Sequence, residues 1–242
     1  MNIKLKSDLF DLSLKKKLEP EIWDGDSLRL LVRERLLKIA YDFIGELEVV
    51  EKEDIEDIRF TGSLANYNYT SYSDIDLHII IDFDKLSADQ KFTQLFFKNK
   101  KSLWNEEHDI KIKGYDVELY VEDSNEKHIS TGVYSVLKDK WIKKPKPIEK
   151  DIDKKAVLKK VEGVIDQYKE LVEDGGTETK LRKLFKKIVD MRKAGLEKEG
   201  ELSIENLAFK ILRRSGIIKQ ITTTFKELHD KMLTLAEQKL LI

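Results

Sequence analysis

The sequence of 242 residues contains no cysteine. Disulfide bonds, thiolate metal sites and cysteine nucleophiles are therefore excluded. Histidine is scarce as well, and His78, His108, His128 and His229 lack the short mutual spacing of zinc ligands. A metal ion bound by this chain is thus expected to depend on oxygen ligands, which suit magnesium or manganese.

Long hydrophobic runs are also absent. The longest apolar stretch, residues 77–83, is interrupted by His78 and Asp82 and is far shorter than the roughly 20 residues that cross a bilayer. The first 20 residues contain lysines but no continuous apolar segment of the kind found in secretory signals. We therefore expect a cytoplasmic protein that does not associate with membranes.

Proline is rare, and two of the three prolines, Pro145 and Pro147, lie almost side by side. Consecutive X-Pro units hold the backbone extended and are typical of linkers. Acidic residues exceed basic ones by 5 before this point, whereas basic residues exceed acidic ones by 4 after it, which gives the overall net charge of −1. The sequence predicts two domains, residues 1–147 and 148–242.

Hydrophobic periodicity predicts a first domain of mixed type. Ser27 is a candidate N-cap for a helix that runs to about Leu47, and a second helix is expected over residues 88–104. Short apolar runs predict strands at residues 58–61, 74–83, 110–113 and 117–121, and a hairpin over 133–142.

The second domain shows only helical patterns. Helices are expected over residues 151–173, 178–196, 203–214 and 218–239, with short connections between them. Short connections favour a compact bundle. The predicted fold class is α+β: a mixed sheet with flanking helices, followed by a C-terminal helical bundle.

One stretch concentrates residues that can perform chemistry. A Gly62-Ser63 turn follows a predicted strand, and after ten further residues the next strand opens with Asp74-Ile75-Asp76. Because side chains alternate along a strand, Asp74 and Asp76 project from one face. Two adjacent carboxylates repel each other unless a cation lies between them. Two aspartates at this spacing usually do no more than form part of a solvated strand face. Here they occur together with the Gly62-Ser63 turn, and this combination favours a metal site.

A third carboxylate is expected from a neighbouring strand if two metal ions are held about 4 Å apart. Glu118 is flanked by apolar residues on both sides and is favoured, while Asp116, two residues earlier on the same face, is the alternative. Gly62 and Ser63 suit a phosphate-binding role. Glycine lets the backbone approach a phosphate closely, and exposed amides with the Ser63 hydroxyl can donate to anionic oxygens.

Positive charge is concentrated in the second domain. Residues 180–193 contain seven basic side chains and one acidic one, a pattern typical either of a solvated helix face or of a basic wall that binds phosphates. Lys210 and Arg214, four residues apart on a predicted helix, lie on one face and are candidate nucleotide-binding residues. His78 follows the acids on the same strand face, where it has either a structural role or one beside the metal ligands.

The Gly62-Ser63 turn, the Ser73-Asp74-Ile75-Asp76-Leu77 run and the later Glu118 resemble the DNA polymerase β-like nucleotidyltransferase superfamily. The spacing is most similar to its minimal and antibiotic-modifying bacterial members, and more loosely to phage-encoded ones. The chain has Asn66-Tyr67 where minimal members commonly have Arg-Gly. The resemblance covers residues 60–135 and implies a nucleotidyltransferase-type fold.

The resemblance also implies an activity. It is the transfer of a nucleoside monophosphate from an NTP, with ATP as the default, to an acceptor hydroxyl with release of pyrophosphate. The acceptor is an RNA 3′ end, a nucleotide, a protein or a small molecule. Two Mg²⁺ ions, or Mn²⁺, are implied as cofactors: Asp74 and Asp76 would bind both, and Glu118 would complete one site and help to deprotonate the hydroxyl. The alternative is a non-catalytic, antitoxin-like module that binds RNA or a protein.

Overall fold

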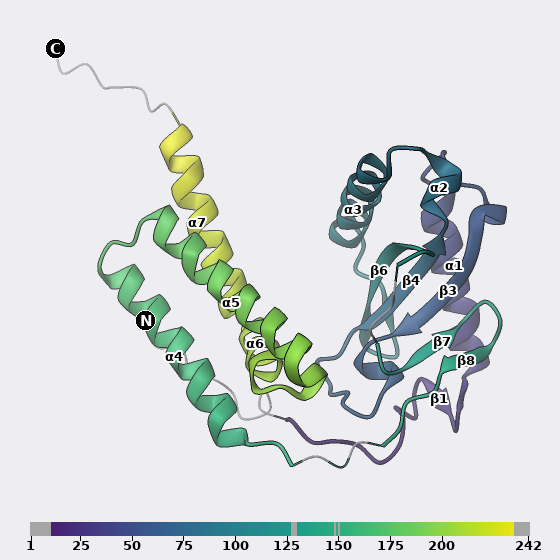
Figure 1. Cartoon of the computed structure of the whole chain (residues 1–242), viewed down its shortest axis with the longest axis horizontal. Helices are drawn as coiled ribbons and strands as arrows, with labels where there is room; N and C mark the ends of the chain where they lie inside the picture. Colours follow the sequence, from purple (N-terminus) through teal and green to yellow (C-terminus); the bar gives the residue numbers. More distant parts are fainter. Residues whose placement is uncertain (1–10, 127–129, 148, 150, 235–242) are drawn as a thin grey trace. The chain divides into compact units, whose positions relative to one another are not determined.

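The computed structural model describes residues 11–126, 130–147, 149 and 151–234 (Figure 1). The chain divides into two compact units, one formed by residues 13–149 and one that contains residues 151–234 together with residues 11 and 12, which the sequence predicts to lie in the first domain. This division lies two residues beyond the boundary expected at Pro147.

The first unit is built on a sheet of six strands in the spatial order β5-β6-β4-β3-β7-β8. The strands are β3 (Ile55–Thr61), β4 (Ile75–Ile81), β5 (Lys111–Ile112), β6 (Tyr115–Asp123), β7 (Val133–Ser135) and β8 (Lys140–Lys143). Only β4 and β6 pair in parallel; the other neighbours in this sheet are antiparallel. The mixed sheet with flanking helices confirms the predicted fold class.

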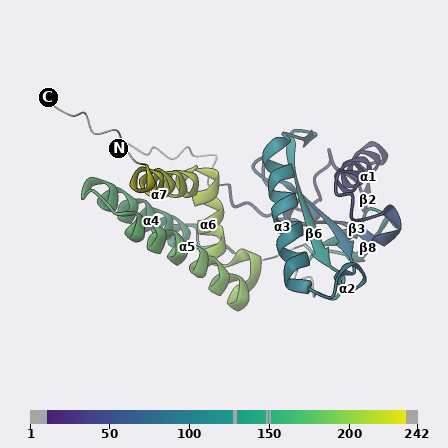
Figure 2. The same cartoon turned by 90° about the horizontal axis from the view of Figure 1, so that it is seen from above.

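The parallel pairing of β4 and β6 requires a crossover connection, since a tight turn can join only antiparallel strands. The crossover consists of the short helix α2 (Phe83–Leu86) and the long helix α3 (Gln90–Glu107). In α3, the Asn105 side chain donates to the carbonyl of Leu119 at 3.0 Å and accepts from its amide at 3.1 Å. These two bonds hold α3 alongside β6 (Figure 2).

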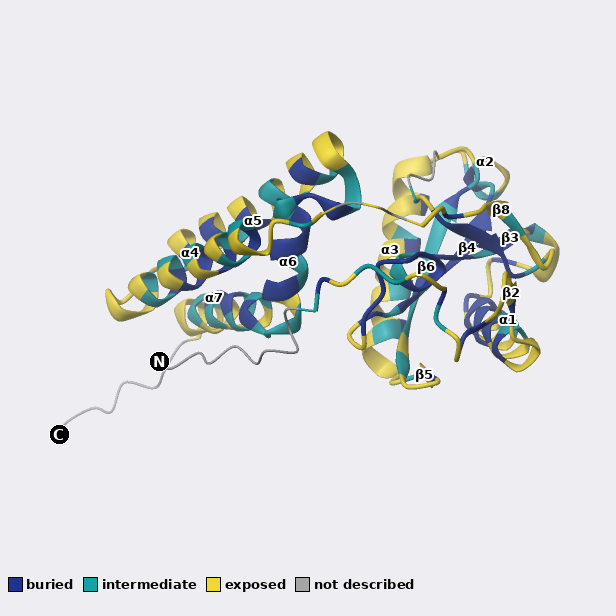
Figure 3. Ribbon diagram, turned by 90° about the horizontal axis from the view of Figure 1, so that it is seen from below, coloured by how far each residue is buried: buried dark blue, intermediate teal, exposed yellow. Residues whose placement is uncertain are grey.

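The core lies on one face of the sheet. Ile75, Leu77, Ile79 and Ile81 alternate along β4 and are fully buried, and β4 is accordingly dark blue in Figure 3. Burying such a side chain stabilises the fold by about 1.5–3 kcal/mol. Helix α1 (Leu30–Gly45) contributes its own buried stripe to the same cluster: Val32, Leu36, Ile39, Ala40, Phe43 and Ile44.

The expected start of α1 is wrong. Ser27 does not cap the helix; it lies in the two-residue strand β2 (Ser27–Leu28), which pairs with β1 (Trp23–Asp24). The helix starts after Arg29, whose side chain makes no capping bond. The cause is tertiary packing, because Leu28 and Trp23 are both buried and the Trp23 ring stacks on Phe60 at 5.5 Å.

The second unit contains four helices over residues 154–233. They are α4 (Lys154–Glu173), α5 (Glu178–Glu199), α6 (Ile204–Arg214) and α7 (Ile217–Leu233). Three begin where a side-chain oxygen accepts a first-turn amide: Asp153 caps α4, Thr177 caps α5 and Ser203 caps α6. The predicted helical bundle is therefore present, although the expected extension of the last helix over residues 235–239 lies outside the described residues.

None of the helices in the described ranges combines the length and the apolar character needed to cross a bilayer.

Candidate active site

Two of the predicted acids lie opposite each other on the parallel pair of strands. Asp76 is the register partner of Glu118 in β6 and of Thr61 in β3. Register partners in adjacent strands project from the same face, and adjacent strands are about 4.8 Å apart. Asp74 immediately precedes β4. All three acids are partly exposed, whereas Ile75 between the two aspartates is fully buried.

The alternative third acid, Asp116, has a different environment. Its side chain is 63% exposed and forms an ion pair with Lys111 of β5, its own register partner. Its position in β6 is one residue before the partner of Ile75. This arrangement favours Glu118 over Asp116 as the acid nearest Asp76, and the assignment of the third acid stays a prediction.

The Gly62-Ser63 turn lies directly against the acids. Gly62 has φ 78° and ψ −162°, a backbone conformation that is essentially restricted to glycine. A Cβ atom at this position would lie 1.8 Å from Oδ2 of Asp76. The absence of a side chain therefore lets the Asp76 carboxylate rest against the backbone of the turn.

Ser63 opens a short 3-10 turn, η3 (Ser63–Ala65), and its Oγ lies 2.7 Å from Oγ of Ser73. Ser73 Oγ in turn accepts the amide of Thr70 at 3.0 Å. The turn is thus tied to the residue that immediately precedes Asp74. The structure brings Gly62, Ser63 and the aspartate pair together.

Tyr120 contacts the same group of acids and was not predicted. Its hydroxyl donates to Oε2 of Glu118 at 2.6 Å. Burial raises the pKa of Tyr120 far above its ordinary value, and the charges of Glu118, Asp76 and Asp74 raise it further. All three carboxylates therefore raise the pKa of the same hydroxyl, which indicates that they lie in one region of negative electrostatic potential. Tyr120 lies two residues after Glu118 in the same strand, and side-chain alternation could have predicted that the two residues share a face.

Lys101 of α3 supplies positive charge beside the acids. Its Nζ lies 4.0 Å from the centre of the Tyr120 ring. Burial lowers the pKa of Lys101, while the charges of Glu118 and Asp76 oppose that effect and favour the ammonium form. No pattern in the sequence singles out this residue, since α3 contains several lysines.

His78 lies two residues after Asp76 in β4 and contacts residues that surround the acids. Its Nε2 lies 3.0 Å from the Thr61 hydroxyl, its Nδ1 lies 2.8 Å from a carboxylate oxygen of Glu122, and its ring stacks on Tyr120 at 4.7 Å. Both ring nitrogens are thus engaged by neighbouring strands. His78 contacts the residue that binds Glu118.

The acids have the chemistry of a site for hard divalent cations. Asp74, Asp76 and Glu118 offer only carboxylate oxygens, which Mg²⁺ and Mn²⁺ prefer, and Gly62 leaves room beside one of them. Among residues 11–126, 130–147, 149 and 151–234, no three Asp, Glu or His side chains form a group that could hold a metal ion as they stand. The carboxylate oxygens are of the type that a divalent cation prefers, and a metal site at these residues stays a prediction.

The other predicted nucleotide-binding residues lie in the second unit. Lys210 and Arg214 are both on α6, four residues apart and partly exposed. Their contact with a nucleotide stays a prediction. In α5, Arg182 pairs with Glu178 and Lys186 with Asp190, each four residues away, as is usual on a solvated helix face.

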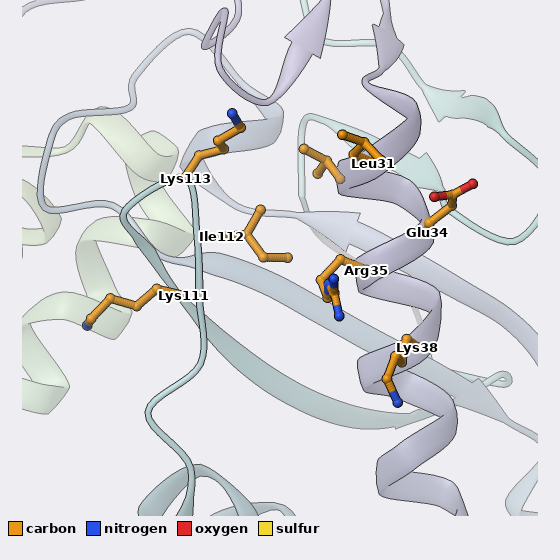
Figure 4. Close-up of a pocket in the computed structure, with 8 residues that line it drawn as sticks. Leu31, Glu34, Arg35, Lys38, Lys111, Ile112 and Lys113 are labelled. Carbon is orange, nitrogen blue, oxygen red and sulfur yellow. The ribbon is translucent and has the colours of Figure 1, made fainter.

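A surface pocket of about 420 Å³ lies elsewhere in the first unit, between α1 and β5 (Figure 4). Figure 4 shows Ile112 and Leu31 facing one another across it, with Arg35 beside them. Its lining contains none of the predicted acids or nucleotide-binding residues. The pocket is therefore distinct from the acidic site.

Comparison with known protein families gave a match within the first unit. Residues 46–146 match the family model described as the nucleotidyltransferase domain. The matched segment contains all six strands of the main sheet, the Gly62-Ser63 turn and the three predicted acids. Comparisons with curated proteins and with solved structures gave no match.

Proposed function

Because residues 46–146 form a nucleotidyltransferase domain of the polymerase β-like family, we propose that this chain is a magnesium-dependent nucleotidyltransferase. It transfers a nucleoside monophosphate from an NTP to an acceptor hydroxyl. The observation that carries the proposal is the register of Asp76 with Glu118 on parallel strands, beside a glycine turn that has room for the Asp76 carboxylate.

In the proposed mechanism Asp74, Asp76 and Glu118 would hold two divalent ions, Mg²⁺ or Mn²⁺. Such ions, when bound, neutralise phosphate charge and lower the pKa of a coordinated hydroxyl. The backbone of Gly62 and the Ser63 hydroxyl bind the triphosphate. Glu118 accepts the proton of the acceptor hydroxyl. The acceptor oxygen then bonds to the α-phosphorus, and the bond from that phosphorus to the departing pyrophosphate breaks.

ATP is the first donor to test, and the proposed acceptors are an RNA 3′ end, another nucleotide, a protein or a small molecule. The proposed location is the cytoplasm. A non-catalytic, antitoxin-like module is not favoured, because the turn and all three acids are present in the matched domain.

The proposal is tested by incubating the protein with each of the four NTPs and Mg²⁺. Pyrophosphate release, label transfer from α-labelled NTP to added RNA or to the protein itself, and calorimetric NTP binding are measured together. NTP binding does not depend on the acceptor, so it reports on the site even when the acceptor is wrong. A protein that binds none of the NTPs and releases no pyrophosphate would contradict the proposal.

The choice of third acid gives a first specific prediction. We expect Glu118→Gln to lower kcat about 100- to 10,000-fold, the range for loss of a general base. Asp116→Asn should leave kcat within about 2-fold, because its exposed ion pair with Lys111 contributes little. Both variants exchange a carboxylate for an amide in β6, so they are matched controls for each other. The opposite ranking in steady-state pyrophosphate release would assign the role to Asp116.

A further inference from the structure

Glu118 is held by a second residue of its own strand. Tyr120 donates to its Oε2 at 2.6 Å, the distance of a charge-assisted O–H to carboxylate bond. A partly exposed glutamate has three rotatable bonds and otherwise populates several rotamers. The bond to Tyr120 selects one of them.

Tyr120 is itself fixed by neighbours from two other elements, β4 and α3. Its ring stacks on His78 of β4 with an interplanar angle of 12°, and the Lys101 ammonium of α3 lies 4.0 Å from the ring centre. His78 is bound on the far side by Thr61 of β3, 3.0 Å away, and its other nitrogen meets Glu122. The tyrosine hydroxyl therefore has little freedom to leave Glu118.

We propose that Tyr120 is a positioning residue that keeps the Glu118 carboxylate in the orientation needed for divalent cation binding beside Asp76, with His78 and Lys101 fixing its ring. This inference rests on the proposed function. Outer partners that bind metal ligands commonly orient them, and their loss lowers metal affinity or activity about 10- to 100-fold.

The test compares Tyr120→Phe with Tyr115→Phe in the full chain. Tyr115 lies in the same strand, and its hydroxyl likewise donates to a glutamate, Glu19, at 3.0 Å. Both variants therefore lose one hydroxyl and one bond to a carboxylate while keeping the ring. Mn²⁺ affinity is measured by electron paramagnetic resonance in the absence of nucleotide, and kcat is measured over a range of Mn²⁺ concentrations. Circular dichroism checks that both variants fold.

We expect Tyr120→Phe to raise the Kd for Mn²⁺ about 10- to 100-fold, and to recover part of its lost kcat at high Mn²⁺. Tyr115→Phe should match the wild type in both. Equal Mn²⁺ affinity in Tyr120→Phe and wild type would overturn the positioning role alone, as would an equal loss in both variants. If the wild type bound no Mn²⁺ and released no pyrophosphate, the proposed function would fall as well, so the two failures are distinguishable.

Discussion

Replacing Asp74 and Asp76 together by asparagine is expected to abolish nucleotidyl transfer while the chain stays folded. Both side chains are partly exposed, and asparagine has nearly the same shape as aspartate. The strand is held by Ile75 and Leu77, which are fully buried and unchanged. Charge stabilisation by bound cations is worth several kcal/mol in the transition state, so kcat should fall by about a thousand-fold or more.

The stability of this double variant should change little, because the buried apolar residues of the strand are retained. The measurements are pyrophosphate release at saturating NTP and Mg²⁺, and the midpoint of thermal unfolding. Asp42→Asn is a suitable control, because Asp42 is exposed on α1 and pairs with Lys38 four residues earlier, a kind of contact worth about 0.3–0.5 kcal/mol. A double variant with more than a tenth of wild-type activity would refute the metal-binding role of the pair.

Gly62→Ala is expected to damage the site in a way that backbone strain alone does not explain. Gly62 and Gly200 have nearly the same conformation, with φ 78° and ψ −162° against φ 76° and ψ −159°. Alanine is strained at both, by about 1–3 kcal/mol. A Cβ at Gly200 meets nothing within 4 Å, whereas at Gly62 it would lie 1.8 Å from Oδ2 of Asp76. Only at Gly62 must a predicted metal ligand move.

We therefore expect Gly62→Ala to lose about 100-fold in kcat, the effect of a displacement of about 1 Å in a catalytic group. Gly200→Ala should keep wild-type activity and lose stability alone. Urea unfolding of the two variants compares the strain, and pyrophosphate release in native buffer compares the activity. Wild-type activity in Gly62→Ala would show that catalysis does not require the Asp76 carboxylate to lie against the backbone of Gly62.

The sequence predicts the parts of this site that depend on local rules. Because side chains alternate along a strand, Asp74 and Asp76 are predicted to lie on one face. The number of residues that separates them from Gly62 can be read directly from the sequence. The register of Asp76 with Glu118 is different in kind, because a shift of one residue would move every side chain of the strand to the other face. That register is set by packing across the whole sheet, so the sequence could favour Glu118 only for its apolar flanks and had to keep Asp116 as the alternative.

The supporting residues were missed for a related reason. Lys101 reaches Tyr120 only because the crossover helix α3 lies along β6, and no short-range pattern encodes that placement. The failed cap at Ser27 has the same origin: Ser27 is a good capping residue locally, but burial of Trp23 and Leu28 draws the segment into an extended hairpin. Local propensity is a weak prior when tertiary contacts compete with it.

The parallel pairing of β4 and β6 also determines when the site can form during folding. Asp76 and Glu118 are far apart in sequence, and they meet only after α3 has closed the crossover between their strands. Such non-local pairings form slowly, because the entropy of loop closure is lost before the contacts reward it. A nascent chain that ends before β6 carries the aspartate pair and the glycine turn but lacks their partner strand. In the proposed enzyme, tight cation binding is thus a late event of folding and marks a finished sheet.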